Sequence, residues 1–201
     1  CVFLVSLCRY LAYLSTFESS SAASISSKRQ NGDGLRFWIA NNSDIAVRAF
    51  EKLPEKKLYV AGNGPMMEEM QRYVREHHME NVKFLGYLQK DEMSEKFYQA
   101  KAVIMTSQCY EAFAMTIAEA YSYGVPVIAG RVGNMDGMVQ DGITGVKFTY
   151  NSAEDLADKI SAFDAMDLSV LKKNARAFYA ERLRPEDNYQ KLIRIYEDIS
   201  K

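Results

Sequence analysis

Residues 111–129 read EAFAMTIAEAYSYGVPVIA, and this stretch decides the fold. It follows an apolar run, Ala102–Thr106, that has the length and β-branched content of a buried strand. The apolar periodicity of Phe113–Tyr123 predicts a helix, which Gly124 ends in the left-handed conformation that glycine favours. A second apolar run, Pro126–Ala129, comes next. Strand, helix and strand in this order predict a parallel βαβ unit.

The same alternation extends through the rest of the chain from Leu35. The sequence predicts further strands at Leu35–Ala40, Lys57–Ala61, Val82–Leu85 and Gly145–Phe148. Further helices are expected at Ser43–Lys52, Pro65–His77, Asp91–Gln99, Met135–Gln140, Ser152–Phe163, Leu168–Glu181 and Pro185–Ser200. The pattern predicts an α/β fold: a Rossmann-like parallel sheet with helices on both faces, followed by C-terminal helices.

Composition excludes several functional classes. The 201 residues carry 25 Lys and Arg against 26 Asp and Glu, a net charge of −1, without the basic excess of a typical nucleic-acid-binding protein. The three cysteines, Cys1, Cys8 and Cys109, have no C-x-x-C spacing. Such cysteines disfavour a disulfide framework or a structural zinc site and suit a reducing compartment. We therefore expect a cytoplasmic location, with any membrane contact made through another part of the protein.

Residues 1–34 differ from the rest of the chain. Residues 1–16 are apolar and aromatic apart from Arg9, but the unbroken run is shorter than the roughly 20 residues of a transmembrane helix. Residues 17–34 are rich in Ser and Gly, as in a loop or linker. We divide the chain into this atypical segment, which is a linker or a first strand and loop, and a domain at 35–201. Because residue 1 is Cys rather than Met, we expect a piece of a longer protein.

Ligands of open parallel sheets bind beyond the carboxyl ends of the strands. Four predicted loops lie there: Gly62–Gly64, Gly86–Leu88, Ser107–Glu111 and Gly130–Gly133. Glycine lets the backbone approach a ligand and adopt positive φ. The third loop leads into the predicted helix, whose first free amides and dipole make an anion site suited to phosphate. These amides belong to Ala114, Met115 and Thr116.

Two glutamates flank this helix start. Glu111 precedes the helix, and Glu119 lies about 12 Å further along if all eight steps are helical. That separation is too large for one carboxylate dyad and suits two contacts on an extended ligand. From the spacing alone a second interpretation stays open, in which Glu111 is a helix-start carboxylate and Glu119 a solvated surface residue.

The segment Glu111–Ala129 resembles the signature of retaining GT-B glycosyltransferases, the large glycosyltransferase family 4. That signature has two glutamates separated by seven residues, a small-residue helix and Gly-x-Pro-Val. Three flanking segments are similar to the family in the same order: Lys57–Pro65 with Gly-x-Gly-Pro, Val82–Leu88 with Phe-Leu-Gly, and Asp141–Gly145 with Asp-Gly-x-Thr-Gly. The chain therefore resembles the C-terminal, donor-binding domain of such an enzyme over residues 44–165.

The resemblance implies roles for single residues. Glu119 would hold the ribose hydroxyls of a nucleoside diphosphate sugar, and Glu111 would contact the transferred sugar and be catalytic. The helix start that follows Phe113 would hold the diphosphate, because oriented amides stabilise the negative charge of that leaving group. The backbone of Tyr87 and Leu88 would meet the nucleobase.

The turn that contains Gly62 and Gly64 belongs to the same expected donor site. The family requires no bound divalent metal, and no residues here have metal-ligand spacing, so we expect neither a metal nor a cofactor. The adjacent His77 and His78 fit the end of a helix better than a ligand pair.

The sequence also departs from the family pattern. Ala114 stands where the family usually has Gly, and Gly133–Gly137 lacks the usual glutamate. Family members carry an Arg and a Lys that grip the diphosphate after the first strand, and no such loop follows Leu35–Ala40. Two explanations stay open. Residues 1–34 supply this strand and loop, with Arg9, Lys28 or Arg29 as stand-ins, or the basic clamp is absent.

The leading hypothesis is the donor half of a retaining hexosyltransferase of polysaccharide or glycolipid synthesis. Its expected partners are a nucleotide-sugar donor and a missing N-terminal acceptor-binding domain, with neither nucleic acid nor a membrane span. Such a half would transfer weakly or not at all by itself. The alternatives are a non-catalytic nucleotide-sugar-binding or assembly module of the same fold, a nucleotide-sugar epimerase, and a generic flavodoxin-like domain.

Overall fold

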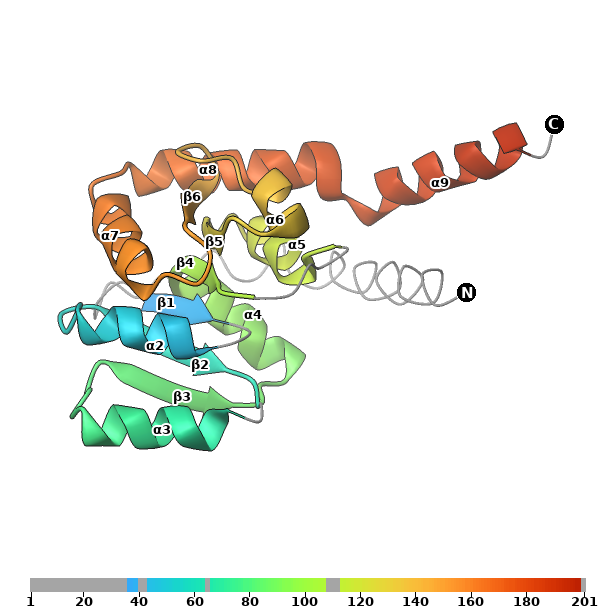
Figure 1. Cartoon of the computed structure of the whole chain (residues 1–201). Helices are drawn as coiled ribbons and strands as arrows, with labels where there is room; N and C mark the ends of the chain where they lie inside the picture. Colours follow the sequence, from blue (N-terminus) through green and yellow to red (C-terminus); the bar gives the residue numbers. More distant parts are fainter. Residues whose placement is uncertain (1–35, 40–42, 64–65, 108–112, 200–201) are drawn as a thin grey trace. The chain divides into compact units, whose positions relative to one another are not determined.

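The computed structural model of the chain describes residues 36–39, 43–63, 66–107 and 113–199 (Figure 1). The chain divides into two compact units. One unit is Asp33–Ala177, and the second contains Phe178–Lys201. The first unit holds the sheet and the predicted site.

Within the described ranges, one parallel sheet of six strands forms the centre of the first unit. The strands are β1 (Arg36–Ile39), β2 (Lys57–Ala61), β3 (Val82–Gly86), β4 (Ala100–Met105), β5 (Val127–Gly130) and β6 (Gly145–Phe148). Their order in space is β3-β2-β1-β4-β5-β6, and every pairing is parallel. This is the doubly wound order of a Rossmann-like fold, so the predicted fold class is confirmed.

The helices between the strands are α2 (Ser43–Glu51), α3 (Met67–Glu76), α4 (Lys90–Gln99), α5 (Met115–Ser122) and α6 (Gly133–Met138). After β6 come α7 (Ala153–Asp164), α8 (Leu168–Phe178) and α9 (Pro185–Ile199). Right-handed crossovers place α2 and α3 on one face of the sheet and α4 and α5 on the other. Helix α7 returns to the first face, where it contacts α2.

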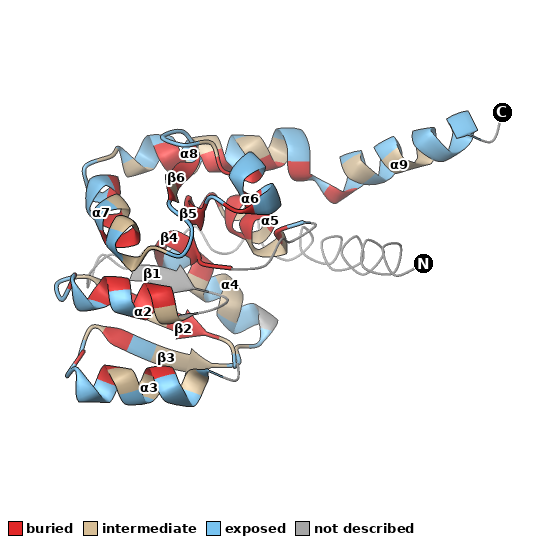
Figure 2. Ribbon diagram, viewed as in Figure 1, coloured by how far each residue is buried: buried red, intermediate tan, exposed pale blue. Residues whose placement is uncertain are grey.

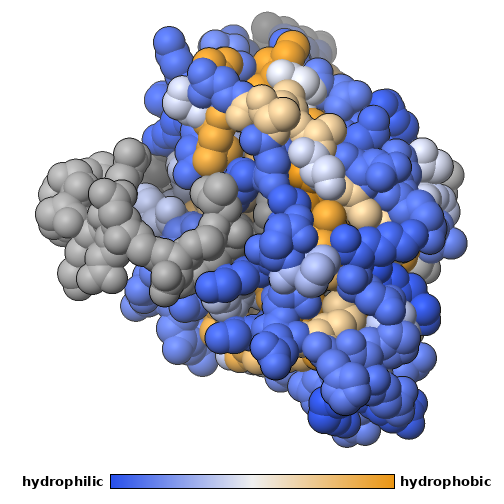
Figure 3. All heavy atoms as spheres, turned by 90° about the vertical axis from the view of Figure 1, so that its left-hand side faces the viewer, coloured by the Kyte–Doolittle hydropathy of each residue, from blue (hydrophilic) through white to orange (hydrophobic). Residues whose placement is uncertain are grey.

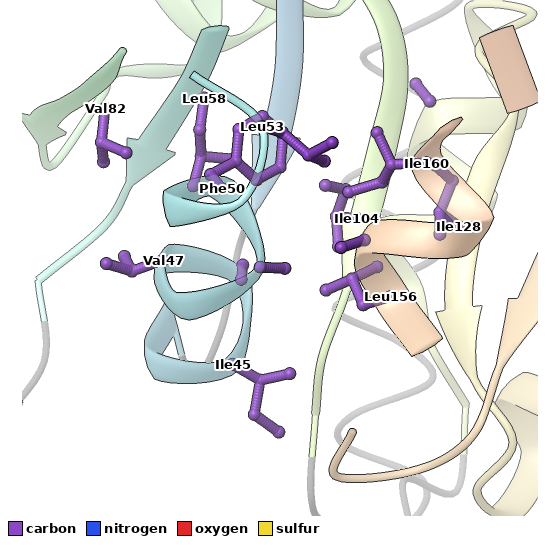
Figure 4. Packing of buried hydrophobic residues seen from close by; sticks show 14 of the residues in the cluster. Ile45, Val47, Phe50, Leu53, Leu58, Val82, Ile104, Ile128, Leu156 and Ile160 are labelled. Carbon is purple, nitrogen blue, oxygen red and sulfur yellow. The ribbon is translucent and has the colours of Figure 1, made fainter. Parts of the chain in front are cut away.

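The core lies between the sheet and the helices α2, α3, α7 and α8 (Figure 2). All residues of β4 and β5 are buried, as expected of central parallel strands covered on both faces. Figure 4 shows Phe50 and Leu53 at the end of α2 beside Leu58 of β2. In the same view Leu156 and Ile160 of α7 face Ile104 and Ile128.

Asp164 ties three elements together where the strands begin. Its carboxylate accepts hydrogen bonds from Lys56, just before β2, and from Lys101 of β4, whose side chain is 7% exposed. Burial alone would raise the pKa of Asp164, but the two ammonium groups outweigh it and hold this pKa below its ordinary value. The side from which Figure 3 views the molecule is the side where the strands begin, and it is mostly hydrophilic with separate hydrophobic patches.

Asn81 stabilises the loop after α2 at the same end of the sheet. Its side-chain amide donates to the carbonyls of Phe50, Leu53 and Lys56 at 2.9, 3.0 and 3.1 Å. These carbonyls belong to the last turn of α2 and the loop after it, where helical partners run out. The loops where strands begin are therefore fixed by side chains from distant positions.

The predicted strands and helices are all present, with differences at their ends. The predicted helix Leu168–Glu181 is α-helical only to Phe178 and continues as a π-helical turn, Tyr179–Leu183. Arg184 then adopts an extended conformation, with φ −61° and ψ 133°, which the following proline favours. Of the helices in the described ranges, none is both long and apolar enough to span a bilayer.

Candidate functional site

The strand order creates a switch point between β1 and β4. From β1 the sheet continues through β2 and β3, and from β4 it continues through β5 and β6 on the other side. Connections that leave in opposite directions open a crevice beyond the carboxyl ends of these two strands. The first two residues after β4 are Thr106 and Ser107, and both are buried.

The loops after β2 and β3 are joined to each other at the same edge. The Gly62 N–H donates to the Gly86 carbonyl at 2.7 Å. Both glycines have positive φ, 104° and 66°, a region that residues with a Cβ rarely adopt. Gly62 thus occupies the kind of position for which the sequence suggested glycine, whereas Gly64 lies outside the described residues.

The loop after β3 leads directly into α4. Tyr87 is 70% exposed, and Leu88 is half-buried. The next backbone N–H, that of Gln89, donates to Oε2 of Glu92 at 2.8 Å, which secures the start of α4. The backbone predicted to meet the nucleobase is therefore held between a strand end and a fixed helix start.

Helix α5 begins two residues later than the sequence predicts. The Met115 N–H donates to the Phe113 carbonyl at 3.0 Å, and the Ile117 N–H donates to the Ala114 carbonyl at 3.0 Å. Ala114 is fully buried and has φ −80° and ψ 84°, outside the helical region. A diphosphate at this turn would compete with Phe113 for the Met115 amide, whereas the roles of the Ala114 and Thr116 amides stay predictions.

The start of α5 differs in charge from most other helix starts of the domain. Its first turn has no acidic side chain. Helices α2, α3, α4 and α7 each carry at least one acid there. An acid in the first turn balances the positive end of the helix dipole. The start of α5 lacks that balance and is therefore the one of these five best suited to an anion.

The two predicted glutamates have different outcomes. Glu119 lies on α5, one turn beyond Met115, and is half-buried. Phe113, just before the helix, is 39% exposed. Glu111 lies outside the described residues, so its predicted distance from Glu119 stays a prediction.

The Asp-Gly-x-Thr-Gly turn holds α5 in place, a role that its motif did not reveal. The hydroxyls of Thr144 and Tyr121 are 2.7 Å apart, and Thr144 also accepts from the Gln140 N–H at 3.0 Å. Burial raises the pKa of Tyr121, although the bond to Thr144 acts in the opposite direction. The sequence shows an aromatic residue within α5 and a threonine beyond α6. Only the fold reveals that their hydroxyls form a pair.

The loop after β5 brings a basic side chain to this edge. Arg131 Nη2 donates to Oδ2 of Asp141 at 3.1 Å, and Nη1 lies 3.7 Å from Oδ1 of Asp136. Asp136 also pairs with Lys147 at 3.0 Å. Arg131 is therefore already engaged with two carboxylates. Arg9, Lys28 and Arg29, the predicted stand-ins for the clamp, lie outside the described residues.

The described residues can also be compared with the needs of a metal site. In the part of the chain that the structure describes, no three His, Cys, Asp or Glu side chains come close enough to hold a metal ion together. His77 instead bonds Glu51, Nδ1 to Oε1 at 2.7 Å, and stacks on Tyr73.

Comparisons with known proteins bear on this arrangement. The sequence profile of the family "Glycosyl transferases group 1" matches residues 36–177, which covers well over half of the chain and nearly coincides with the first compact unit. The chain belongs to the group 1 glycosyl transferases. The Arabidopsis thaliana sulfoquinovosyl transferase SQD2 is 29% identical over 146 residues, which cover 70% of this chain and 28% of that protein.

Solved structures of glycosyltransferases share the fold. The Anabaena protein HepE in complex with UDP-glucose matches with a TM-score of 0.75 and 21% identity, over 83% of this chain and 49% of that one. The C-terminal domain of the glycosyl transferase group 1 protein LpcC from Francisella tularensis matches with a TM-score of 0.66 and 18% identity, over 75% of this chain and 86% of that one.

The matches cover only part of each curated relative. The chain spans between 28% and 44% of the length of the first four curated relatives that it matches. Against the LpcC C-terminal domain alone, the match covers 86% of that chain. The resemblance to a C-terminal glycosyltransferase domain of the GT-B fold is thus confirmed.

Proposed function

We propose that this domain binds the nucleoside diphosphate sugar for a retaining glycosyltransferase of family 4. The observation that carries the proposal is α5, the helix that follows central strand β4, whose first turn carries no acidic side chain and which holds Glu119 one turn further along. A diphosphate needs oriented positive dipoles, and a ribose needs a carboxylate that accepts from its hydroxyls. The UDP-glucose complex of HepE supports a donor of this class for the shared fold.

In this proposal each element of the edge has one task. The start of α5 holds the diphosphate and stabilises the charge that develops when the sugar leaves. Glu119 accepts hydrogen bonds from the ribose hydroxyls, and the backbone of Tyr87 and Leu88 meets the nucleobase. Glu111 contacts the transferred hexose and assists its transfer, and the turn around Gly62 leaves room for the donor.

The acceptor is bound elsewhere in the proposal. The chain matches 49% of the HepE chain, so a second domain of similar size has room to supply acceptor contacts. We therefore expect weak or no transfer by these 201 residues alone, whereas robust transfer without any partner polypeptide would contradict this part. A cytoplasmic location and the lack of a resident metal belong to the same proposal.

The test is calorimetric titration of the 201-residue chain with UDP-sugars and GDP-sugars. Glu119→Ala is expected to weaken binding of the donor about 10- to 100-fold, because a hydrogen bond to a charged group contributes about 1.5–3 kcal/mol. Glu76→Ala is the matched control, since Glu76 is an exposed glutamate at the far end of α3. Equal binding by wild type and Glu119→Ala would contradict the assigned role.

A second candidate is a module that keeps the fold without turnover. Two observations favour such a module. The Met115 amide is already bonded to the Phe113 carbonyl, and Gly137 stands where the family has a glutamate. Failure of every UDP- and GDP-sugar to bind would favour this module over the donor site. A nucleotide-sugar epimerase would instead convert a donor without acceptor, which product analysis with donor alone would reveal.

A further inference from the structure

Helix α5 is held by two tyrosine hydroxyls. Tyr121 bonds Thr144 on the side of α6 and β6, and Tyr123 donates to Oγ of Ser94 on α4. The oxygen–oxygen distance is 2.7 Å in both pairs. The proposed donor helix is thus connected through hydroxyls to two different neighbours.

The Tyr123 ring is fixed by the aromatic side chains of α4. It stacks on Phe97 with centroids 5.2 Å apart and planes at 13°, and it meets Tyr98 edge-on at 4.9 Å and 81°. Phe97 itself is buried. Because the ring is packed on two sides, its hydroxyl has a defined position relative to Ser94.

The Tyr123–Ser94 bond lies one helical turn after Glu119 on the side of α5 and about two turns after the nucleobase loop on the side of α4. Ser94 follows the start of α4 at Lys90 by four residues, and α4 directly continues the loop that holds Tyr87 and Leu88. Glu119 of α5 precedes Tyr123, the residue that caps the end of α5, by four residues. A turn of helix is about 5.4 Å, so the bond links the two elements about one turn from Glu119 and about two turns from Tyr87 and Leu88.

We propose that Tyr123 is a positioning residue that sets the distance between the nucleobase loop on α4 and the ribose carboxylate Glu119 on α5. The inference rests on the proposed function, because it assigns these two ends to one nucleoside. Tyr123 does not touch the donor. Its hydroxyl fixes the spacing of two elements that do.

This arrangement separates the two parts of the ligand. The proposed diphosphate contacts lie on α5 alone, so the spacing between α4 and α5 leaves them unchanged. A nucleoside spans both helices and depends on that spacing. Loss of the Tyr123 hydroxyl should therefore weaken binding of UDP and leave binding of inorganic pyrophosphate unaltered.

The experiment measures dissociation constants of UDP and pyrophosphate for wild type, Tyr123→Phe, Ser94→Ala and the double variant. Tyr123→Phe is expected to weaken UDP binding about two- to ten-fold, the range of one neutral hydrogen bond, with pyrophosphate unchanged. Ser94→Ala should have the same effect, and the double variant should be no weaker than either single variant.

Tyr121→Phe is the matched control, because it removes a buried phenol hydroxyl with the same bond length from the same helix. It should leave the ratio of UDP affinity to pyrophosphate affinity at the wild-type value. Hydrogen exchange without ligand adds a second measurement, in which Tyr123→Phe should exchange faster at amides 87–93 than Tyr121→Phe does.

The outcomes separate the inference from the proposed function. If wild type binds UDP and Tyr123→Phe binds it equally well, the inference is wrong and the donor site stands. Equal weakening of UDP and pyrophosphate would also overturn the inference, because it indicates general damage to α5. If wild type binds neither UDP nor GDP, the proposed function and this inference fall together.

Discussion

The two ends of the same sheet are built with different chemistry. Where the strands begin, Asp164 accepts from Lys56 and Lys101, and Asn81 donates to three carbonyls. Where the strands end, the described loops contain the positive-φ glycines Gly62 and Gly86 and a helix start without acids. The first end is held by bonds among its own side chains and carbonyls, and the second presents glycine turns and a helix dipole that suit a ligand.

This difference shows how a doubly wound domain divides stability from binding. Charged side chains at the strand beginnings use one another as partners, so their loss should reduce stability and leave ligand binding intact. Groups at the strand ends should show the reverse. Each of the following changes tests one side of that division.

The largest expected effect is on stability, from Gly145→Ala at the beginning of β6. A Cβ at Gly145 would lie 1.8 Å from the carbonyl oxygen of Val127, its partner in β5. Backbone atoms of two paired strands cannot both move aside, so we expect a loss of about 3 kcal/mol or more in the free energy of unfolding, or no folded protein. Chemical denaturation and circular dichroism check this outcome.

Gly137→Ala is the control for that change. A Cβ at Gly137 meets nothing within 4 Å, and the residue lies inside α6. Because alanine favours helix over glycine by about 0.5–1 kcal/mol, this variant should be as stable as wild type or slightly more stable. A loss as large as that of Gly145→Ala would show that crowding at β6 is not the cause.

Asp164→Asn should lower the free energy of unfolding by about 2 kcal/mol at neutral pH. It removes the counter-charge of Lys101, whose side chain is 7% exposed, and of Lys56, and uncompensated charge is costly away from water. Nucleotide affinity should not change, because the residue lies where the strands begin. Denaturant titration measures the free energy of unfolding, and calorimetry measures nucleotide affinity. Reduced affinity at unchanged stability would contradict a purely structural role for Asp164.

The contribution of Asp164 should also depend on pH. Its pKa is lowered in the folded state, so its stabilisation is fully present above the ordinary carboxyl pKa of about 3.9 and is lost as pH falls through the folded value. The difference in unfolding free energy between wild type and Asp164→Asn should therefore shrink in acid. A difference that stays constant from pH 7 to pH 3 would argue against ionisation as the source.

The smallest expected effect on stability comes from Glu119→Ala. Glu119 is half-buried on α5 at the proposed binding end, and the change should alter the free energy of unfolding by no more than about 0.5 kcal/mol. Its effect on donor binding should nevertheless be large. Thermal denaturation beside the titration compares both quantities on the same protein sample, and a large loss of stability would move Glu119 to the structural group.

The sequence predicts local elements but not contacts between distant residues. The strands, the helices and the position of Gly62 follow from local patterns, because periodicity and turn chemistry act within a few residues. The Asp164 cluster joins residues 63 and 108 positions apart, and the Tyr121–Thr144 pair joins residues 23 apart. Only the folded chain brings such side chains together. The start of α5 was predicted two residues early because the Met115–Phe113 bond delays the helix.

The most direct test of the binding end is a nuclear magnetic resonance titration of the labelled chain with UDP and with GDP. We expect chemical-shift changes concentrated at the amides of residues 61–63, 86–88 and 113–119, where the strands end and α5 begins. Amides of residues 53–57, 100–101 and 163–166, where the strands begin, should remain unchanged. Changes concentrated at the second group, or no change with either nucleotide, would contradict the assignment of this edge as the donor site.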